Sequence, residues 1–172
     1  MPEQPPKFMV KAYHGTEPYC FVSYSHADSA LVFGELATIA KAGYRVYYDE
    51  GIHPGHTWHD ELANAIAGST LFVLIVTRHS VAPANCAREL NFALDRKIPI
   101  LAIHYDDVEL SPGLQLALGN RQAIIRSRFT DSDFHERVVG AIGEHLAADR
   151  GAVASASLAA GVSGCHSSPP VS

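Results

Sequence analysis

The sequence lacks the features that mark nucleic-acid-binding and disulfide-bonded proteins. Its 13 lysines and arginines are outnumbered by 18 aspartates and glutamates, which gives a net charge of −5. Because no basic excess is present to neutralise a phosphate backbone, we expect no nucleic-acid partner. The three cysteines, Cys20, Cys86 and Cys165, are an odd number without CxxC spacing. This count argues against a disulfide framework and a zinc knuckle, and it favours a reducing compartment.

Long apolar runs are also missing. No segment approaches the roughly 18 consecutive apolar residues that a membrane-spanning helix needs. Residues 1–7 are rich in proline and charge and carry no apolar run that a signal peptide would require. We therefore expect a soluble, cytoplasmic protein with no membrane partner.

The composition that is present suits one globular domain. A chain of 172 residues, 47% of them hydrophobic, is long enough for one core and too short for two full domains. Residues 1–18 hold four prolines without apolar periodicity, which predicts a flexible N-terminal segment. Residues 148–172 are mostly small and include no aromatic side chain, so they bury too little area to offset the entropy of ordering. We expect a flexible tail there, or a linker to an effector or sensor domain, and a folded domain over residues 19–147.

Within this domain, short β-branched or aromatic runs alternate with segments of helical periodicity. The alternation predicts a parallel sheet covered by helices on both faces, which is a three-layer α/β domain. The run 71–77 is apolar on both faces, as a central strand requires. Gly43 and Gly68 follow two helical segments, where a left-handed helix end is expected. The stretch 104–120 predicts a loop with at most a short helix. The predicted strands are 19–24, 44–48, 71–77, 98–103 and 122–125, and the predicted helices lie around 32–40, 58–66, 86–94 and 134–146.

Polar residues follow the first three predicted strands. Ligands of open α/β sheets bind beyond the carboxyl ends of the strands, where the strand order reverses. The segments 25–28, 49–51 and 78–80 would meet there. A receiver domain is excluded, because the strands 71–77 and 122–125 are not followed by the aspartate and lysine it needs. The absence of GxGxxG and GxxxxGK excludes a glycine-rich phosphate loop.

Three segments together resemble the Toll/interleukin-1 receptor (TIR) domain. Phe21–Asp28 resembles the first box of that family, Tyr48–Trp58 resembles its loop after the second strand, and Ser80–Leu90 resembles its Ser-x5-Cys-x2-Glu helix. Order and spacing agree over about residues 19–147, and the bacterial branch is the most similar. The resemblance implies a flavodoxin-like three-layer sandwich with five parallel strands in the order 2-1-3-4-5.

The resemblance also implies one of two functions. Some TIR domains cleave the nicotinamide–ribose bond of NAD with the glutamate of this motif, which is Glu89 here. They release nicotinamide and ADP-ribose or a cyclic isomer, often in bacterial antiphage immunity and after self-assembly; NAD is then a substrate and no cofactor is required. The alternative is a non-catalytic scaffold that signals by binding other TIR domains.

One carboxylate is chemically sufficient for this cleavage. Nicotinamide leaves from a nitrogen that is already positively charged, so no general acid is needed. A carboxylate hydrogen-bonded to the ribose can stabilise the oxocarbenium-like transition state. A solvated helix glutamate paired with Arg88 or Lys97 is the structural alternative for Glu89.

Several neighbours of Glu89 in this pattern are candidate substrate-binding residues. Each also has an ordinary structural explanation: a serine can cap a helix, an aspartate can close a turn, and a tryptophan can anchor a core. We expect Ser80 to cap the helix that carries Glu89, Asp28 to cap the first helix, and the Cys86 thiol to be buried and inert. The candidates are Tyr24, Ser25, His26, Asp49, Trp58, Ser80, Asn85 and Cys86.

Two local features qualify this interpretation. Asn85 stands where NAD-cleaving relatives often carry an aromatic residue against the substrate, so weaker binding or a site completed by a second subunit is expected. His53, His56 and His59 are spaced HxxHxxH. No cysteine or carboxylate cluster completes a tetrahedral metal set around them, so we predict no metal site and a loop whose charge changes near pH ~6.5.

Overall fold

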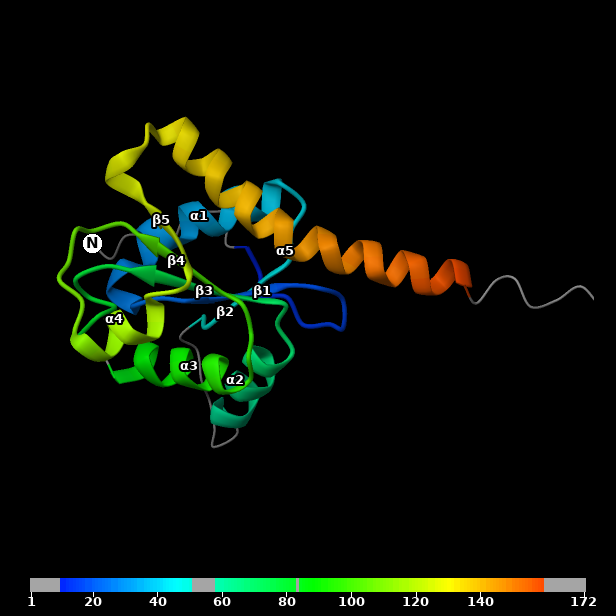
Figure 1. The fold of residues 1–172 in the computed structure, drawn as a ribbon, viewed down its shortest axis with the longest axis horizontal. Coiled ribbons are helices and arrows are strands. Elements are labelled where there is room, and N and C mark those ends of the chain that lie inside the picture. The colour runs from blue at the N-terminus through cyan, green and yellow to red at the C-terminus, as the bar shows by residue number, and fades with distance from the viewer. Residues whose placement is uncertain (1–9, 51–57, 83, 160–172) are drawn as a thin grey trace, which may run out of the picture.

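The sheet has five parallel strands. The computed structural model describes residues 10–50, 58–82 and 84–159, and of residues 84–85 and 147–159 the backbone only. The strand order is β2-β1-β3-β4-β5, which confirms the predicted order (Figure 1). The strands are β1 (Cys20–Ser23), β2 (Val46–Tyr48), β3 (Leu71–Val76), β4 (Ile100–His104) and β5 (Gln122–Ile125).

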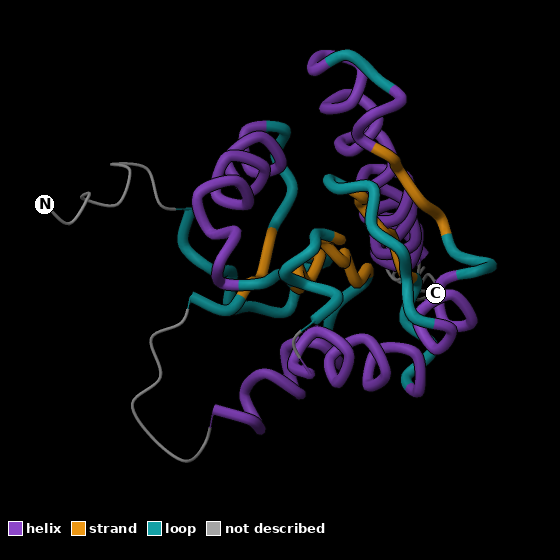
Figure 2. The backbone as a smooth tube through the Cα atoms, turned by 90° about the vertical axis from the view of Figure 1, so that its left-hand side faces the viewer, coloured by secondary structure: helices purple, strands orange, loops and turns teal. Residues whose placement is uncertain are grey.

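Helices cover both faces of this sheet, as the alternation predicted. On one face α1 (Ser29–Lys41) and α5 (Asp131–Ala159) pack over the sheet, and on the other face α2 (Trp58–Ala67), α3 (Ala84–Asp95) and α4 (Pro112–Leu118) do so. Two short 3₁₀ helices, η1 (His26–Asp28) and η2 (Arg126–Arg128), follow β1 and β5. Figure 2 shows the helices on either side of the strands.

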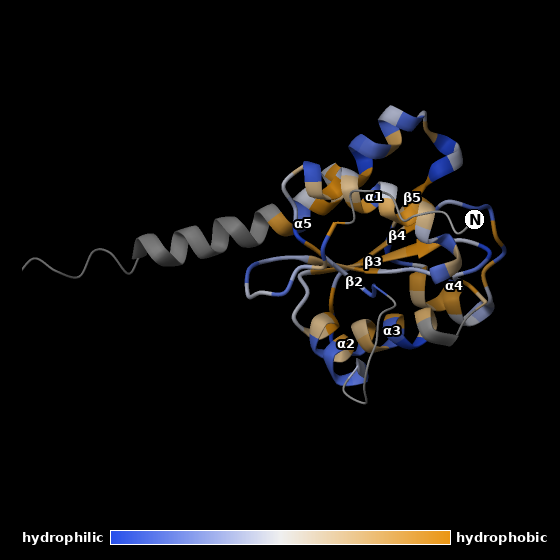
Figure 3. Ribbon diagram, turned by 180° about the vertical axis from the view of Figure 1, so that it is seen from behind, coloured by the Kyte–Doolittle hydropathy of each residue, from blue (hydrophilic) through white to orange (hydrophobic). Residues whose placement is uncertain are grey.

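The central strand separates two hydrophobic clusters. All six residues of β3 are buried, and alternate side chains enter opposite clusters, as Val73 and Phe72 do. Phe72 stacks on Phe21 of β1, with ring centroids 5.5 Å apart. Figure 3 shows these hydrophobic strands between helices in which hydrophobic and hydrophilic residues are mixed. The apolar run 71–77 therefore forms the central strand that its composition predicted.

Both ends of the predicted domain carry more structure than expected. At the N-terminus, the Tyr13 amide donates a hydrogen bond to the Val46 carbonyl at 2.8 Å, so part of the segment 1–18 lies along edge strand β2. At the C-terminus, α5 continues to Ala159, beyond the predicted boundary at residue 147. The chain after this boundary is rich in alanine, which has the highest helix propensity. Residues 1–9 and 160–172, the remainder of the predicted flexible ends, lie outside the described residues.

Two glycines follow helices for different reasons. Gly43 has φ +90° after α1, as predicted. Gly68 follows α2 without a positive φ, so the predicted left-handed helix end is wrong there. A Cβ at Gly68 would lie 2.9 Å from the Tyr19 hydroxyl oxygen, which donates a hydrogen bond to the Ala65 carbonyl at 2.5 Å. Gly68 therefore permits a close approach that any side chain would obstruct.

We expect Gly68→Ala to lower the free energy of unfolding by about 1–2 kcal/mol, because the new methyl group displaces a buried hydroxyl from its hydrogen bond. Urea unfolding measures this change. Gly140→Ala is the matched control, since a Cβ at that position in α5 meets nothing within 4 Å. It should be neutral or gain about 0.5–1 kcal/mol from helix propensity. Equal effects of the two substitutions would contradict the role assigned to Gly68.

Candidate functional site

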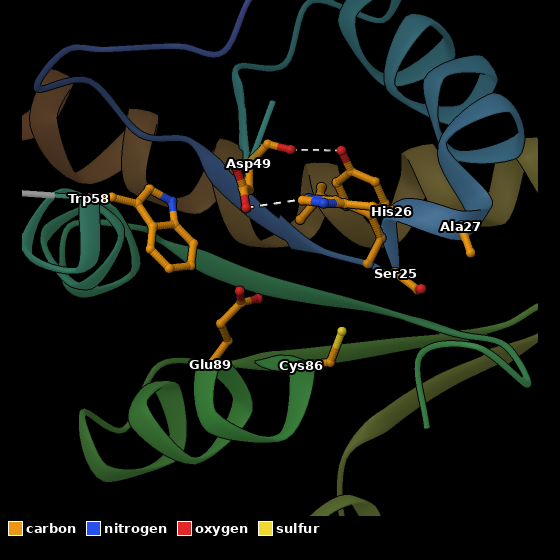
Figure 4. Close-up of a pocket in the computed structure, with 9 residues that line it drawn as sticks. Ser25, His26, Ala27, Asp49, Trp58, Cys86 and Glu89 are labelled. Atoms are coloured by element: carbon orange, nitrogen blue, oxygen red, sulfur yellow. Dashed lines mark hydrogen bonds and ion pairs between the residues drawn. The ribbon is translucent and has the colours of Figure 1, made fainter. Parts of the chain in front are cut away.

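A cavity of about 220 Å³ lies at the carboxyl end of β1, the strand that pairs with β3. The strand order reverses between these two strands, so the cavity occupies the location expected for a ligand in an open α/β sheet. Figure 4 shows Glu89 reaching into it from α3, opposite His26 and Asp49, with Trp58 to one side. The lining residues are Val22, Tyr24, Ser25, His26, Ala27, Asp49, Trp58, Cys86 and Glu89.

The Glu89 carboxyl group is held by a serine from β1. The hydroxyl of Ser23 donates a hydrogen bond to Glu89 Oε2 at 2.5 Å. Burial raises the pKa of Glu89 to about 7, the Ser23 hydrogen bond opposes this rise, and the nearby charge of Asp49 adds to it. Glu89 is therefore divided between its neutral and ionised forms at neutral pH.

Asp49 and His26 form the opposite side of the cavity. His26 Nε2 lies 3.3 Å from Asp49 Oδ2, and the Tyr24 hydroxyl donates a hydrogen bond to the Asp49 backbone carbonyl at 2.7 Å. The Asp49 side chain is 13% exposed, whereas the His26 side chain is 54% exposed. The carboxylate therefore lies inside the cavity and the imidazole lies at its mouth.

Cys86 lies one turn before Glu89 on α3, and its side chain is buried. Burial raises the pKa of its thiol to about 11, and the Glu89 charge adds to the rise. The thiol is thus protonated at physiological pH. This agrees with the expectation that Cys86 is inert and gives no support for a nucleophile.

Ser80 does not occupy the position predicted for it. Helix α3 begins at Ala84, and Ser80 instead closes the turn after β3. Its hydroxyl accepts a hydrogen bond from the Thr77 amide at 2.8 Å, and its own amide donates to Thr77 Oγ1 at 3.0 Å. Ser80 is not among the residues that line the cavity, so both its predicted cap and a direct substrate contact lack support in this structure.

Asp28 occupies the predicted N-cap position of α1. Its side chain makes no capping hydrogen bond to α1. Instead, Asp28 Oδ2 accepts a hydrogen bond from the Thr77 hydroxyl at 2.6 Å, and Asp28 Oδ1 lies 2.7 Å from His79 Nδ1. These contacts join the loop after β1, which lines the cavity, to the loop after β3.

The structure describes the side chain of Trp58 but not that of Asn85. Trp58 begins α2, lines the cavity and also packs against the cluster beneath that helix, so it combines the two roles considered for it. The side chain of Asn85 lies outside the described residues, as do His53 and His56 of the histidine run. In the part of the chain that the structure describes, no group of three or more potential metal ligands occurs.

The family model of the TIR domain matches residues 20–139. The chain belongs to the TIR-domain family. No curated protein matches this sequence.

Across residues 10–50, 58–82 and 84–159, no helix is both long and apolar enough to cross a membrane.

Solved TIR-domain structures resemble this one. The TIR domain of the Toll-related receptor TRR-2 from Hydra magnipapillata has a TM-score of 0.59 and 18% identity, over 72% of this chain and 96% of that one. The RPS4 and RRS1 TIR-domain heterodimer has a TM-score of 0.55 and 16% identity, over 75% of this chain and 98% of that one. A metazoan TIR-STING receptor from C. gigas has a TM-score of 0.55 and 19% identity, over 77% of this chain and 43% of that one. At these identities the likeness establishes the fold alone.

Proposed function

We propose that this TIR domain is an NAD glycohydrolase or ADP-ribosyl cyclase of the bacterial type, with Glu89 as its catalytic residue. The observation that carries the proposal is the Glu89 carboxyl group in the cavity at the point where the strand order reverses. A glutamate paired with Arg88 or Lys97 on the surface would be the structural alternative. Instead, Glu89 contacts Ser23, and burial perturbs its pKa. A strongly perturbed carboxyl group in a cavity supports a functional role.

The charges of the cavity suit the nicotinamide end of NAD. Asp49 and Glu89 are acidic, and His26 is the one potential cation among the described lining residues. Such a cavity favours a positively charged pyridinium ring and disfavours a diphosphate. Its volume of about 220 Å³ is also below the ~300–1,000 Å³ of pockets that enclose a whole drug-sized ligand. The nicotinamide riboside end would enter, and the rest of the dinucleotide would lie outside.

In the reaction, the bond between the ribose and the pyridinium nitrogen breaks, and nicotinamide leaves with the bonding electron pair. The ionised Glu89 carboxylate stabilises the positive charge that develops on the ribose. Water then attacks to give ADP-ribose, or a nitrogen of the adenine attacks to give a cyclic isomer. Four other lining residues would bind the ribose, and Trp58 would contact the ring; the four are Asp49, His26, Tyr24 and Ser25.

We further propose that the domain acts in bacterial antiphage immunity and is activated when copies assemble. The sequence resemblance to the bacterial branch supports this setting, and a second copy would supply binding surface that Asn85 does not. A cytoplasmic location accords with the free thiols of Cys20 and Cys86. An effector or sensor domain attached after α5 would provide the trigger.

A non-catalytic scaffold is the second candidate function. Asn85, in place of an aromatic residue, favours it, and the RPS4–RRS1 structure is a complex of two TIR domains. For this chain, the scaffold would bind other TIR domains without consuming NAD. Glu89 would then be free to vary without functional loss.

A product assay separates the two candidates. We expect the purified chain, incubated with NAD at increasing protein concentration, to release nicotinamide together with ADP-ribose or a cyclic isomer, separated by chromatography. Because the ionised carboxylate is the active form, the rate should rise with pH through about 7. No nicotinamide from a chain that light scattering shows to be assembled would contradict the enzymatic proposal and favour the scaffold.

A further inference from the structure

A buried hydroxyl lies directly beside the proposed catalytic carboxyl group. Ser23 is the last residue of β1 and is 1% exposed. Its Oγ donates a hydrogen bond to Glu89 Oε2. The same hydroxyl also interacts with the Cys86 thiol, whose pKa a Ser23 hydrogen bond lowers. The contact joins the central sheet to the helix that carries the reacting group.

We propose that Ser23 is a positioning residue for Glu89, and that its hydroxyl holds one carboxylate oxygen so that the other faces the substrate in the charged form. This inference rests on the proposed function. Ser23 does not line the cavity, so it acts through Glu89 and not on the substrate.

The surroundings of Glu89 show why such a donor matters. Asp49, after β2, adds like charge, and Cys86, on the same helix, is a neutral thiol. His26, in η1, is directed to Asp49. No lysine or arginine occurs among the described lining residues. Burial and Asp49 both favour protonation of Glu89, and the Ser23 hydrogen bond is the opposing influence.

The choice of serine at this position also indicates a role. Its neighbours in the chain, Val22 and Tyr24, are buried hydrophobic residues. A buried hydroxyl costs free energy unless it is hydrogen-bonded, and an apolar residue would satisfy the same core position without that requirement. A polar group that lies in the core beside the proposed catalytic carboxyl group is the pattern expected where function outweighs packing.

The experiment is a pH titration of the Glu89 carboxyl carbon by ¹³C NMR, in the wild type and in Ser23→Ala, with activity profiles on the same samples. We expect the midpoint to rise by about one pH unit in Ser23→Ala, which lowers the ionised fraction at pH 7 about fivefold. The kcat–pH profile should move in the same direction while KM changes little. Ser23→Thr, which keeps the hydroxyl, should restore the wild-type midpoint.

Ser69→Ala is the matched control. Ser69 is also buried, but its hydroxyl donates to the Ile66 carbonyl, so the substitution should leave the Glu89 midpoint unchanged. Equal midpoints in the wild type and Ser23→Ala, with an active enzyme, would overturn the role of Ser23 and leave the proposed function intact. A wild type without activity would overturn the proposed function, and the NMR midpoints would still decide whether Ser23 controls the charge of Glu89.

Discussion

Glu89→Gln is expected to lower nicotinamide release roughly 100- to 1,000-fold, because removing one electrostatic contribution to a transition state typically costs that much. Glutamine has the size of glutamate, and its amide oxygen can still accept the Ser23 hydrogen bond. It carries no negative charge, so it cannot stabilise a positive charge on the ribose. Initial rates at saturating NAD measure the loss, and circular dichroism checks the fold.

Asp95→Asn provides the control for this substitution. Asp95 is the last residue of the same helix and is exposed, so its replacement also exchanges one carboxyl group for an amide but does not touch the cavity. We expect this variant to keep the wild-type rate. Retained activity in Glu89→Gln, or a comparable loss in Asp95→Asn, would mean that the chemistry does not depend on the Glu89 carboxylate.

Much of the fold and part of the site could be predicted from local patterns. The apolar run of β3 identified a central strand, and the resemblance to the TIR family implied the strand order, in which the reversal lies between β1 and β3. Residues that follow the strands, such as His26 and Asp49, converge because parallel strands end at one edge. Glu89 reaches the same cavity because the Ser-x5-Cys-x2-Glu spacing sets the number of residues between the end of β3 and Glu89 on α3.

The contacts between side chains could not be predicted in the same way. Ser23 belongs to a short apolar run that predicts a buried strand. Such a run does not show which residue of a covering helix contacts the serine hydroxyl. The partners of Asp28 are Thr77 and His79, which are distant in the sequence and meet only after β1 and β3 pair. The turn that Ser80 closes with Thr77 is a local contact, and it was missed because α3 starts at Ala84, later than the motif suggests.

A buried carboxyl group in this position destabilises the fold when it is charged. The pKa of Glu89 is raised from 4.5 to about 7 in the folded protein. The folded state therefore holds the proton more tightly than the unfolded state, and this contribution to stability is fully present below pH ~4.5. It is lost as the pH rises through about 7, where the folded-state carboxyl ionises. The charge that the proposed reaction requires thus costs stability at the pH of activity.

Glu89→Gln should consequently be more stable than the wild type at pH 8, by about 1–3 kcal/mol, and nearly equal to it at about pH 4. For a domain of this size, each kcal/mol corresponds to a shift in Tm of roughly 2–4 °C. Urea unfolding at the two pH values measures the difference without NAD. Asp95→Asn, which removes an exposed charge, should show no comparable dependence on pH. A Glu89→Gln variant that is less stable than the wild type at pH 8, or whose advantage is the same at both pH values, would show that the Glu89 carboxylate is not held at a cost in the folded protein.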